Sequence, residues 1–144
     1  MISQSRAEAL RDAGLRWTPA PGDRFAIPKP GLAGQVFTLS EMTIEAREYP
    51  TGTVLGFNGT TEWALDSVAK EEALWLPRED QLRELLGRTF VSLRWEEGDG
   101  REPSHTVSTR GPGGGWEFMA RTAEDAYADA LLALIAHAMD DAQV

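Results

Sequence analysis

The sequence contains no cysteine, and this absence excludes several chemistries at once. Disulfides, thiolate nucleophiles and cysteine-ligated zinc or iron–sulfur sites all need that side chain. Histidine is scarce too, since only His105 and His137 are present. His105 adjoins Ser104, but neighbouring strand residues point to opposite faces, and His137 with Asp140 supplies only two metal ligands. We therefore expect no catalytic residue, no bound metal and no cofactor.

Lysine and long apolar runs are also rare. Lys29 and Lys70 are the only lysines, and the formal net charge is −9. An acidic surface repels phosphate backbones, so we expect no nucleic-acid binding. The longest apolar run, residues 130–139, is too short to span a bilayer, and the polar N-terminal segment lacks the apolar stretch of a signal peptide. We expect a cytoplasmic protein without a membrane partner.

What is present is typical of a globular protein. The chain has 144 residues, of which 42% are hydrophobic and 26% are charged. This length predicts one domain, residues 1–144, with a core that needs no covalent cross-link. Five tryptophans and five phenylalanines can supply that core. Trp116 follows four glycines in five positions, and of the five tryptophans it is the one that we expect to be partly exposed.

Four segments have a helical pattern. They cover residues 3–13, 61–70, 77–87 and 121–141. In the first, Ser5 and Glu8 have the spacing of a capping box, and in the last, Thr122 and Asp125 do. The last segment has the clearest apolar stripe, and its alanines would let it lie close to a sheet.

The strand signals fall into two groups. An N-terminal group comprises a short edge strand at 24–27, flanked by prolines, and strands at 35–40, 43–49 and 53–57; a C-terminal group comprises 89–97, 105–110 and 115–120. The glycine-rich segment 111–115 leads into a strand and not a helix, so it predicts a hairpin and not a phosphate-binding loop. The short joins indicate antiparallel strands, and each group is expected to form a meander.

This order predicts an α+β fold. The elements run α-β-β-β-α-α-β-β-β-α, with one or two antiparallel meander sheets covered by helices. The C-terminal helix is expected to pack on the sheet. Helices would then cover one face and leave the other in solvent, although the sequence does not specify which face is open.

The stretch "GFNGTTEWALDS", residues 56–67, is the candidate site, because it concentrates unusual residue types where a strand meets a predicted helix. Asn58, Thr60, Glu62 and Trp63 are its predicted binding residues, with Arg47 added from the polar face of the neighbouring strand. A structural interpretation competes with this one: Asn58 forms a tight turn, Thr60 caps the helix and Trp63 anchors it in the core.

Two resemblances accompany these patterns. With "GLRWTP", "GDRF", "GFNGTTEWALDS" and "EEALWLPREDQLRELLG", the chain resembles a group of small uncharacterised actinobacterial proteins, some of which are labelled as pilus-assembly proteins. No nucleotide-binding loop or pilin-like helix supports that label here. The C-terminal half, with "WLPREDQLRELL" and "TAEDAYADALLALI", is similar to small prophage-type proteins of unknown function. Neither resemblance implies a catalytic residue.

The leading functional hypothesis is a non-catalytic binding or interaction module with a protein partner, and a homodimer is compatible with it. One alternative is an acidic immunity- or antitoxin-like protein that neutralises a basic effector. The other is a small-ligand-binding protein or enzyme, which would need a polar cleft containing Arg47, Glu62 or His105.

Overall fold

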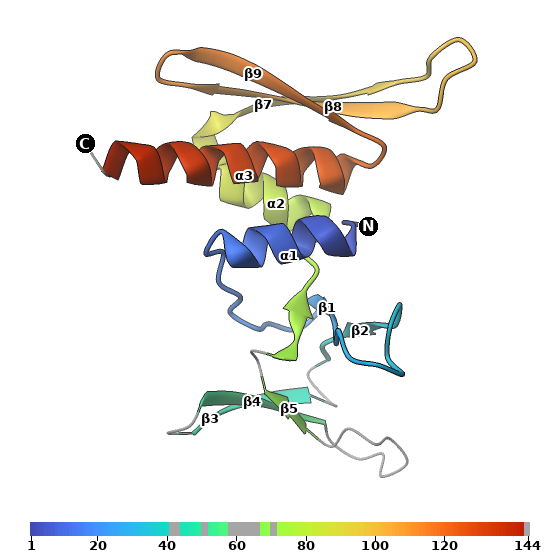
Figure 1. Ribbon diagram of the computed structural model, residues 1–144, viewed down its shortest axis with the longest axis vertical. Helices are drawn as coiled ribbons and strands as arrows, with labels where there is room; N and C mark the ends of the chain where they lie inside the picture. The colour runs from blue at the N-terminus through green and yellow to red at the C-terminus, as the bar shows by residue number, and fades with distance from the viewer. Residues whose placement is uncertain (41–43, 50–51, 58–66, 70–71, 143–144) are drawn as a thin grey trace. The chain divides into compact units, whose positions relative to one another are not determined.

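The computed structural model describes residues 1–40, 44–49, 52–57, 67–69 and 72–142 (Figure 1). Its contacts divide the chain into two compact units, which we describe separately. Unit 1 combines Met1–Leu15 with Pro77–Val144, and unit 2 is Arg16–Leu76. In sequence, unit 2 is therefore an insertion into unit 1. The predicted single domain stays a prediction.

Unit 1 contains the three α-helices of the described residues. They are α1 (Gln4–Asp12), α2 (Glu79–Leu86) and α3 (Ala123–Ala142), and a 3-10 turn, η2 (Gly87–Thr89), follows α2. Figure 1 shows α3 along one face of a sheet, with α2 and α1 on its other side. None of the helices in the described part of the chain is long and apolar enough to cross a membrane.

The helix ends follow local capping rules, with one correction. Asp125 N donates to Thr122 Oγ1 (3.1 Å), which confirms the predicted cap of α3. The cap of α1 is Ser3, whose Oγ accepts from Arg6 N at 3.4 Å, so the predicted cap at Ser5 was wrong. Ser3 is fixed just before α1 because its own N–H donates to Asp125 Oδ1 (2.7 Å).

The sheet of unit 1 is the predicted C-terminal meander. It has the order β7 (Phe90–Glu96), β8 (Ser104–Gly111) and β9 (Gly114–Ala120), all antiparallel. The tight turn between β8 and β9 uses Gly113 at a φ of 96°, which an L side chain rarely adopts. The contacts of α3 with β8 and β9 confirm the α+β class and the packing of the last helix on the sheet.

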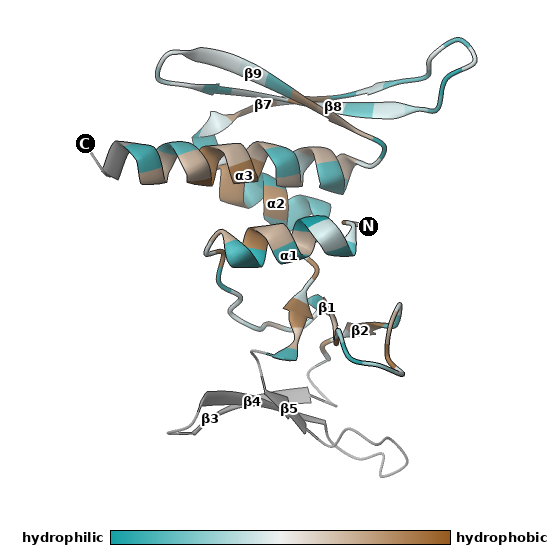
Figure 2. Cartoon of the chain, in the orientation of Figure 1, coloured by the Kyte–Doolittle hydropathy of each residue, from teal (hydrophilic) through white to brown (hydrophobic). Residues whose placement is uncertain are grey.

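The core of unit 1 is where the helices meet this sheet. Its fully buried side chains come from α1, α2, β8 and α3: Leu10, Leu82, Val107 and Tyr127. Figure 2 shows hydrophobic colour over α2 and the middle of α3, as this core requires. Each such side chain contributes about 1.5–3 kcal/mol when it leaves water, so the helices are held mainly by burial.

Unit 2 contains two further three-stranded antiparallel sheets. The first has the order β2 (Val36–Thr38), β1 (Arg24–Ala26) and β6 (Leu74–Trp75). The prediction of an edge strand at 24–27 was therefore wrong, since β1 is central. The prolines flank β1 and none lies within it, so its N–H groups remain able to pair on both sides.

The second sheet of unit 2 has the order β3 (Ile44–Tyr49), β4 (Gly52–Phe57) and β5 (Ser67–Ala69). Here β3 and β4 form a hairpin as expected, but β2 pairs with β1 and not with β3, so the predicted N-terminal meander is split. The helix predicted over 61–70 was wrong at 67–69, where pairing with β4 outweighs local propensity. Residues 61–66 and 70 lie outside the described part.

Candidate functional site

The predicted site can be placed only in part. Asn58, Thr60, Glu62 and Trp63 lie outside the described residues. Arg47 lies on β3, in register with Val54 of β4. These binding residues therefore stay a prediction.

The two histidines considered for catalysis or metal binding, His105 and His137, both belong to unit 1. His105, named for a polar cleft, is half-buried on β8, and its Nδ1 is 3.0 Å from the carbonyl oxygen of Arg121. This contact assigns His105 a local structural role at the end of β9. In the described part of the chain, no three histidine or carboxylate side chains gather as metal ligands.

A cavity of about 130 Å³ lies between the sheet of unit 1 and α3. Its helical wall is formed by Ala130, Ala133, Leu134 and His137. These positions have the spacing i, i+3, i+4 and i+7, so they share one face of α3. That face points at the sheet, and it carries two alanines where longer side chains would close the gap.

The opposite wall comes from the β8–β9 hairpin. Trp116 pairs with Thr109 in register, and Phe118 lies two residues further along β9, so all three side chains are on the face that meets α3. The indole of Trp116 also reaches across to β8, where a Cβ on Gly111 would come within 3.5 Å of its Cζ3. That distance is an ordinary van der Waals contact, so the ring of Trp116 lies beside Gly111 at the end of the hairpin.

The cavity has a buried floor and an exposed rim. Ala130 and Thr109 are buried, whereas Trp116 is 40% exposed and His137 is exposed. Across the rim, the rings of Trp116 and His137 contact each other, with centroids 5.4 Å apart and planes tilted by 38°. A ligand would therefore enter beside two aromatic rings and end against small, mostly apolar groups.

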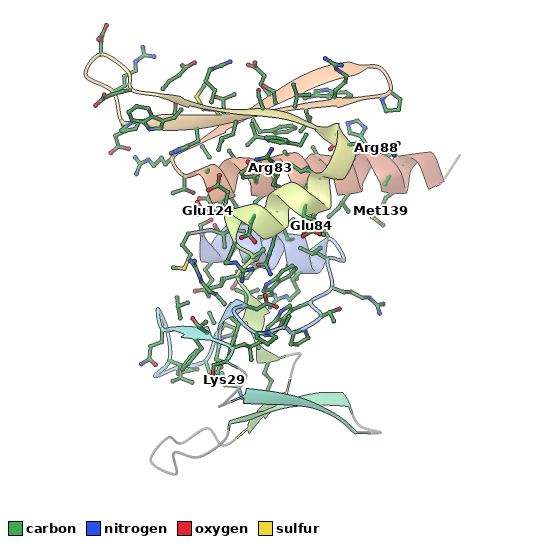
Figure 3. The ribbon with its side chains drawn as sticks, turned by 180° about the vertical axis from the view of Figure 1, so that it is seen from behind. Lys29, Arg83, Glu84, Arg88, Glu124 and Met139 are labelled. Atoms are coloured by element: carbon green, nitrogen blue, oxygen red, sulfur yellow. The ribbon has the colours of Figure 1, made fainter. Side chains whose placement is uncertain are left out.

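Figure 3 shows where two other side chains of unit 1, Met139 and Arg88, lie. Met139, two residues after His137, projects from the side of α3 away from the sheet, so it does not line the cavity. Arg88 lies next to the start of β7, beside Thr89, which does line it. The two aromatic rings at the rim, those of Trp116 and His137, come from the hairpin and from the sheet-facing side of α3.

Charge in unit 1 is strongly negative. Its two segments contain nine arginines, no lysine and fifteen acidic residues, a formal charge of −6. On the face of the sheet away from α3, Arg94 forms ion pairs with Glu96 (2.5 Å) and, more loosely, with Glu117 (3.9 Å). Such exposed pairs contribute little to stability, but the excess of carboxylates creates a field that attracts cations.

The cavity is lined by few polar groups. Its polar lining residues are His137, Arg110 and two threonines, and Thr89 Oγ1 already donates to the Leu86 carbonyl oxygen (2.7 Å). Acid–base catalysis needs groups with contrasting environments held around a substrate, and the lining residues include no carboxylate. The volume is close to that of an engineered 150 Å³ protein cavity that binds benzene, and this cavity is open to solvent at its rim.

Sequence reasoning found one component of this cavity. It predicted that Trp116 is partly exposed, which is confirmed, and it did not single out Trp95, which is more exposed at 56%. It missed His137 as the ring partner of Trp116. The available signals were the alanines of α3 and the glycine-rich hairpin, but the sequence does not show that they face each other.

Comparisons with known proteins give no family for the chain. Scans against protein-family models, curated proteins and solved structures find no match. The resemblances to actinobacterial and prophage-type proteins therefore stay predictions.

Proposed function

We propose that the protein is a non-catalytic binding module that acts in the cytoplasm, and that unit 1 presents its contact surface at the rim of the cavity. One observation carries this proposal: the partly exposed indole of Trp116 stacks on His137 at the entrance to an apolar cavity. Tryptophan is enriched, with tyrosine and arginine, among the residues that dominate binding energy at protein interfaces. The lining chemistry favours binding over catalysis.

The interaction can be tested by affinity capture from native lysate. Wild-type protein is compared with Trp116→Ala and with Trp95→Ala, which removes an exposed indole from the same sheet but not from the cavity. We expect Trp116→Ala to lose a partner that Trp95→Ala retains, and the purified partner should then bind wild-type protein directly. If Trp116→Ala captures the same partners in the same amounts, the proposed surface is wrong.

The predicted corner around Asn58–Trp63 is a second candidate surface, supported by sequence alone. The double variant Glu62→Ala, Trp63→Ala belongs in the same experiment. Loss of the partner in this variant and not in Trp116→Ala would move the interaction from unit 1 to unit 2. If both variants still capture the partner, neither surface is the binding site.

A further inference from the structure

We propose that the protein forms a homodimer in which the β9 strands of two copies pair edge to edge and join their sheets into one. This inference goes beyond the proposed binding function and concerns a different surface, the outer edge of β9. Three features carry it: the free backbone groups of β9, the absence of the features that usually block such an edge, and a register in which β9 pairs favourably with itself.

The first feature is the set of backbone groups on the outer edge of β9. β8 lies between β7 and β9, and nothing else in the described part of the chain pairs with β9. A two-residue turn joins Gly111 to its register partner Gly114, so the N–H of Gly114 points at β8. Backbone groups alternate along an antiparallel strand, so those of Gly115, Glu117 and Met119 point away from β8. These three residues therefore offer donors and acceptors to another strand.

The second feature is that β9 lacks the lysine, proline and β-bulge with which natural proteins block strand edges. Its seven residues include one charged side chain, Glu117, and its register with β8 is unbroken over its whole length. The other edge strand, β7, has a register shift between Phe90 and Ser92 and carries both Arg94 and Glu96. The edge of β9 is thus the more open of the two to strand addition.

The third feature is a register that suits two copies of β9. Joined sheets require that residues of the same face oppose each other and that outward backbone groups meet. Centring the pair on Phe118 meets both conditions: the two Phe118 rings then oppose each other, Glu117 faces Met119, and Trp116 faces the small Ala120. Centring it on Glu117 would oppose two carboxylates, which is destabilising. Centring it on Trp116 would leave Phe118 and Glu117 opposite glycines, without a side chain to pack on.

The same pairing brings the two α3 helices to contact distance. In each copy α3 packs on both β8 and β9. Joining the β9 edges therefore separates the two helices by about two strand spacings, or about 9–10 Å. Packed helices lie roughly 8–10 Å apart, so the helices would touch without being forced together. Helix contact adds area to a strand edge that alone is small for a stable interface.

The oligomeric state tests the inference directly. Sedimentation equilibrium of the full chain is measured from about 10 µM to about 1 mM, which covers weak association. We expect a mass above the monomer value of 15.8 kDa that approaches twice this value at the highest concentration. A mass that stays at the monomer value would overturn the inference. Assembly beyond the dimer would overturn it too, because pairing closes the β9 edge.

A matched pair of proline variants identifies the edge. Met119→Pro and Trp95→Pro each remove an outward N–H from the last residue but one of an edge strand, on β9 and on β7 respectively. Neither removes a hydrogen bond within the sheet, so both should fold, which circular dichroism checks. We expect Met119→Pro to be monomeric at the highest concentration and Trp95→Pro to dimerise like wild type. Any other outcome in the folded variants would overturn the pairing through β9.

Charge at position 119 tests the register, and it replaces the proline test if Met119→Pro does not fold. Met119→Glu would oppose Glu117 of the second copy with a like charge, and Met119→Lys would oppose it with an unlike charge, twice in each dimer. We expect Met119→Glu to dimerise at least about tenfold more weakly than Met119→Lys at low salt, and the difference to shrink at about 0.5 M salt. Adding Glu117→Lys to Met119→Glu should restore the dimer. Equal dissociation constants for the two single variants would overturn this register.

These outcomes are separable from those of the capture experiment, since Met119 does not line the cavity. A dimer in a protein with no Trp116-dependent partner would contradict the proposed function and leave this inference standing. A monomer that captures a Trp116-dependent partner would do the reverse.

Discussion

Trp17 of unit 2 and Trp116 of unit 1 use the same side chain in opposite ways. Trp17 is 6% exposed, its ring lies 5.6 Å from that of Phe25, and its Nε1 donates to Asp23 (2.9 Å), itself a buried carboxylate. Trp116 is 40% exposed and covers a cavity. Trp17 therefore has both apolar contacts for its ring and a hydrogen-bond acceptor for its N–H group, whereas part of the surface of Trp116 is open to a ligand.

The difference indicates which aromatic residues stabilise the fold and which are available for binding. In unit 2 the rings of Trp17, Phe25 and Phe37 form a continuous cluster, and together with Leu39 they make up much of its apolar interior. In unit 1 the interior is filled by three helices, so Trp116 is not needed to complete the core. The predictions below test this division, from the largest expected effect to the smallest.

Phe25→Ala should have the largest effect, because Phe25 is fully buried between the rings of Trp17 and Phe37. We expect it to lower the free energy of unfolding by about 3–5 kcal/mol, through lost burial and the cavity left behind. Urea denaturation followed by circular dichroism measures the change. The control Val36→Ala, exposed on β2 of the same sheet, should stay within about 0.5 kcal/mol of wild type. A similar loss in both variants would show that the aromatic cluster has no special role.

Arg6→Ala should have the next largest effect, and it concerns unit 1. Arg6 Nε donates to Asp129 (2.9 Å) and Nη1 to Asp125 (3.2 Å), which joins α1 to α3. The hydrogen bond with Asp129 raises the pKa of Arg6. Removing the guanidinium leaves two carboxylates one turn apart without this partner, and we expect a loss of about 1–2 kcal/mol.

The Arg6 test has a conservative comparison in Arg6→Lys, which keeps the charge but not the two-pronged geometry. Urea unfolding should place it between wild type and Arg6→Ala. If Arg6→Ala is as stable as wild type, the ion pairs of Arg6 do not contribute to the attachment of α1, which then depends on burial and on the hydrogen bond from Ser3 N to Asp125.

The sequence predicted unit 1 better than unit 2, for a physical reason. In unit 1 each element carries its own signal: a capping threonine at Thr122, a helix-ending glycine at Gly87 and a glycine-rich hairpin. In unit 2 the strands are short, and their partners are set by contacts far along the chain, such as β1 with β6. Local patterns do not encode that pairing, so the central position of β1 and the strand β5 were both missed.

The cavity was harder to predict than the fold because it exists where small side chains leave space unfilled. No residue in it has an unusual type or a recognisable motif. Its origin is the coincidence of Ala130 and Ala133 on α3 with Gly111 on the hairpin, and the sequence does not show that these positions face each other. The stretch around Glu62 attracted attention for its composition, whereas the cavity is defined only by packing.

Trp116→Ala should have a smaller effect on stability than Phe25→Ala, about 1–2 kcal/mol, because 40% of the residue is already in solvent. Trp95→Ala, its control at the other end of the sheet, should change the free energy of unfolding by less than about 0.5 kcal/mol. Both values come from urea unfolding. A loss above about 3 kcal/mol for Trp116→Ala would place this ring with the core aromatics and weaken its assignment to binding.

Tyr127→Phe should be nearly neutral at pH 7 and should matter only in alkali. Tyr127 is buried on α3 with its ring 5.7 Å from that of Phe90, so it is the core counterpart of Trp116 in unit 1. Burial raises the pKa of Tyr127 above the usual value of 10, with a further contribution from Glu79. Above pH 10 the unfolded chain therefore releases this proton before the folded protein does, and stability falls as pH rises. The phenylalanine variant lacks that group, so its unfolding free energy should decline less steeply between pH 9 and pH 11. Identical slopes for wild type and Tyr127→Phe would mean that this phenol reaches solvent, and the contrast between a closed core and an open rim within unit 1 would then not hold.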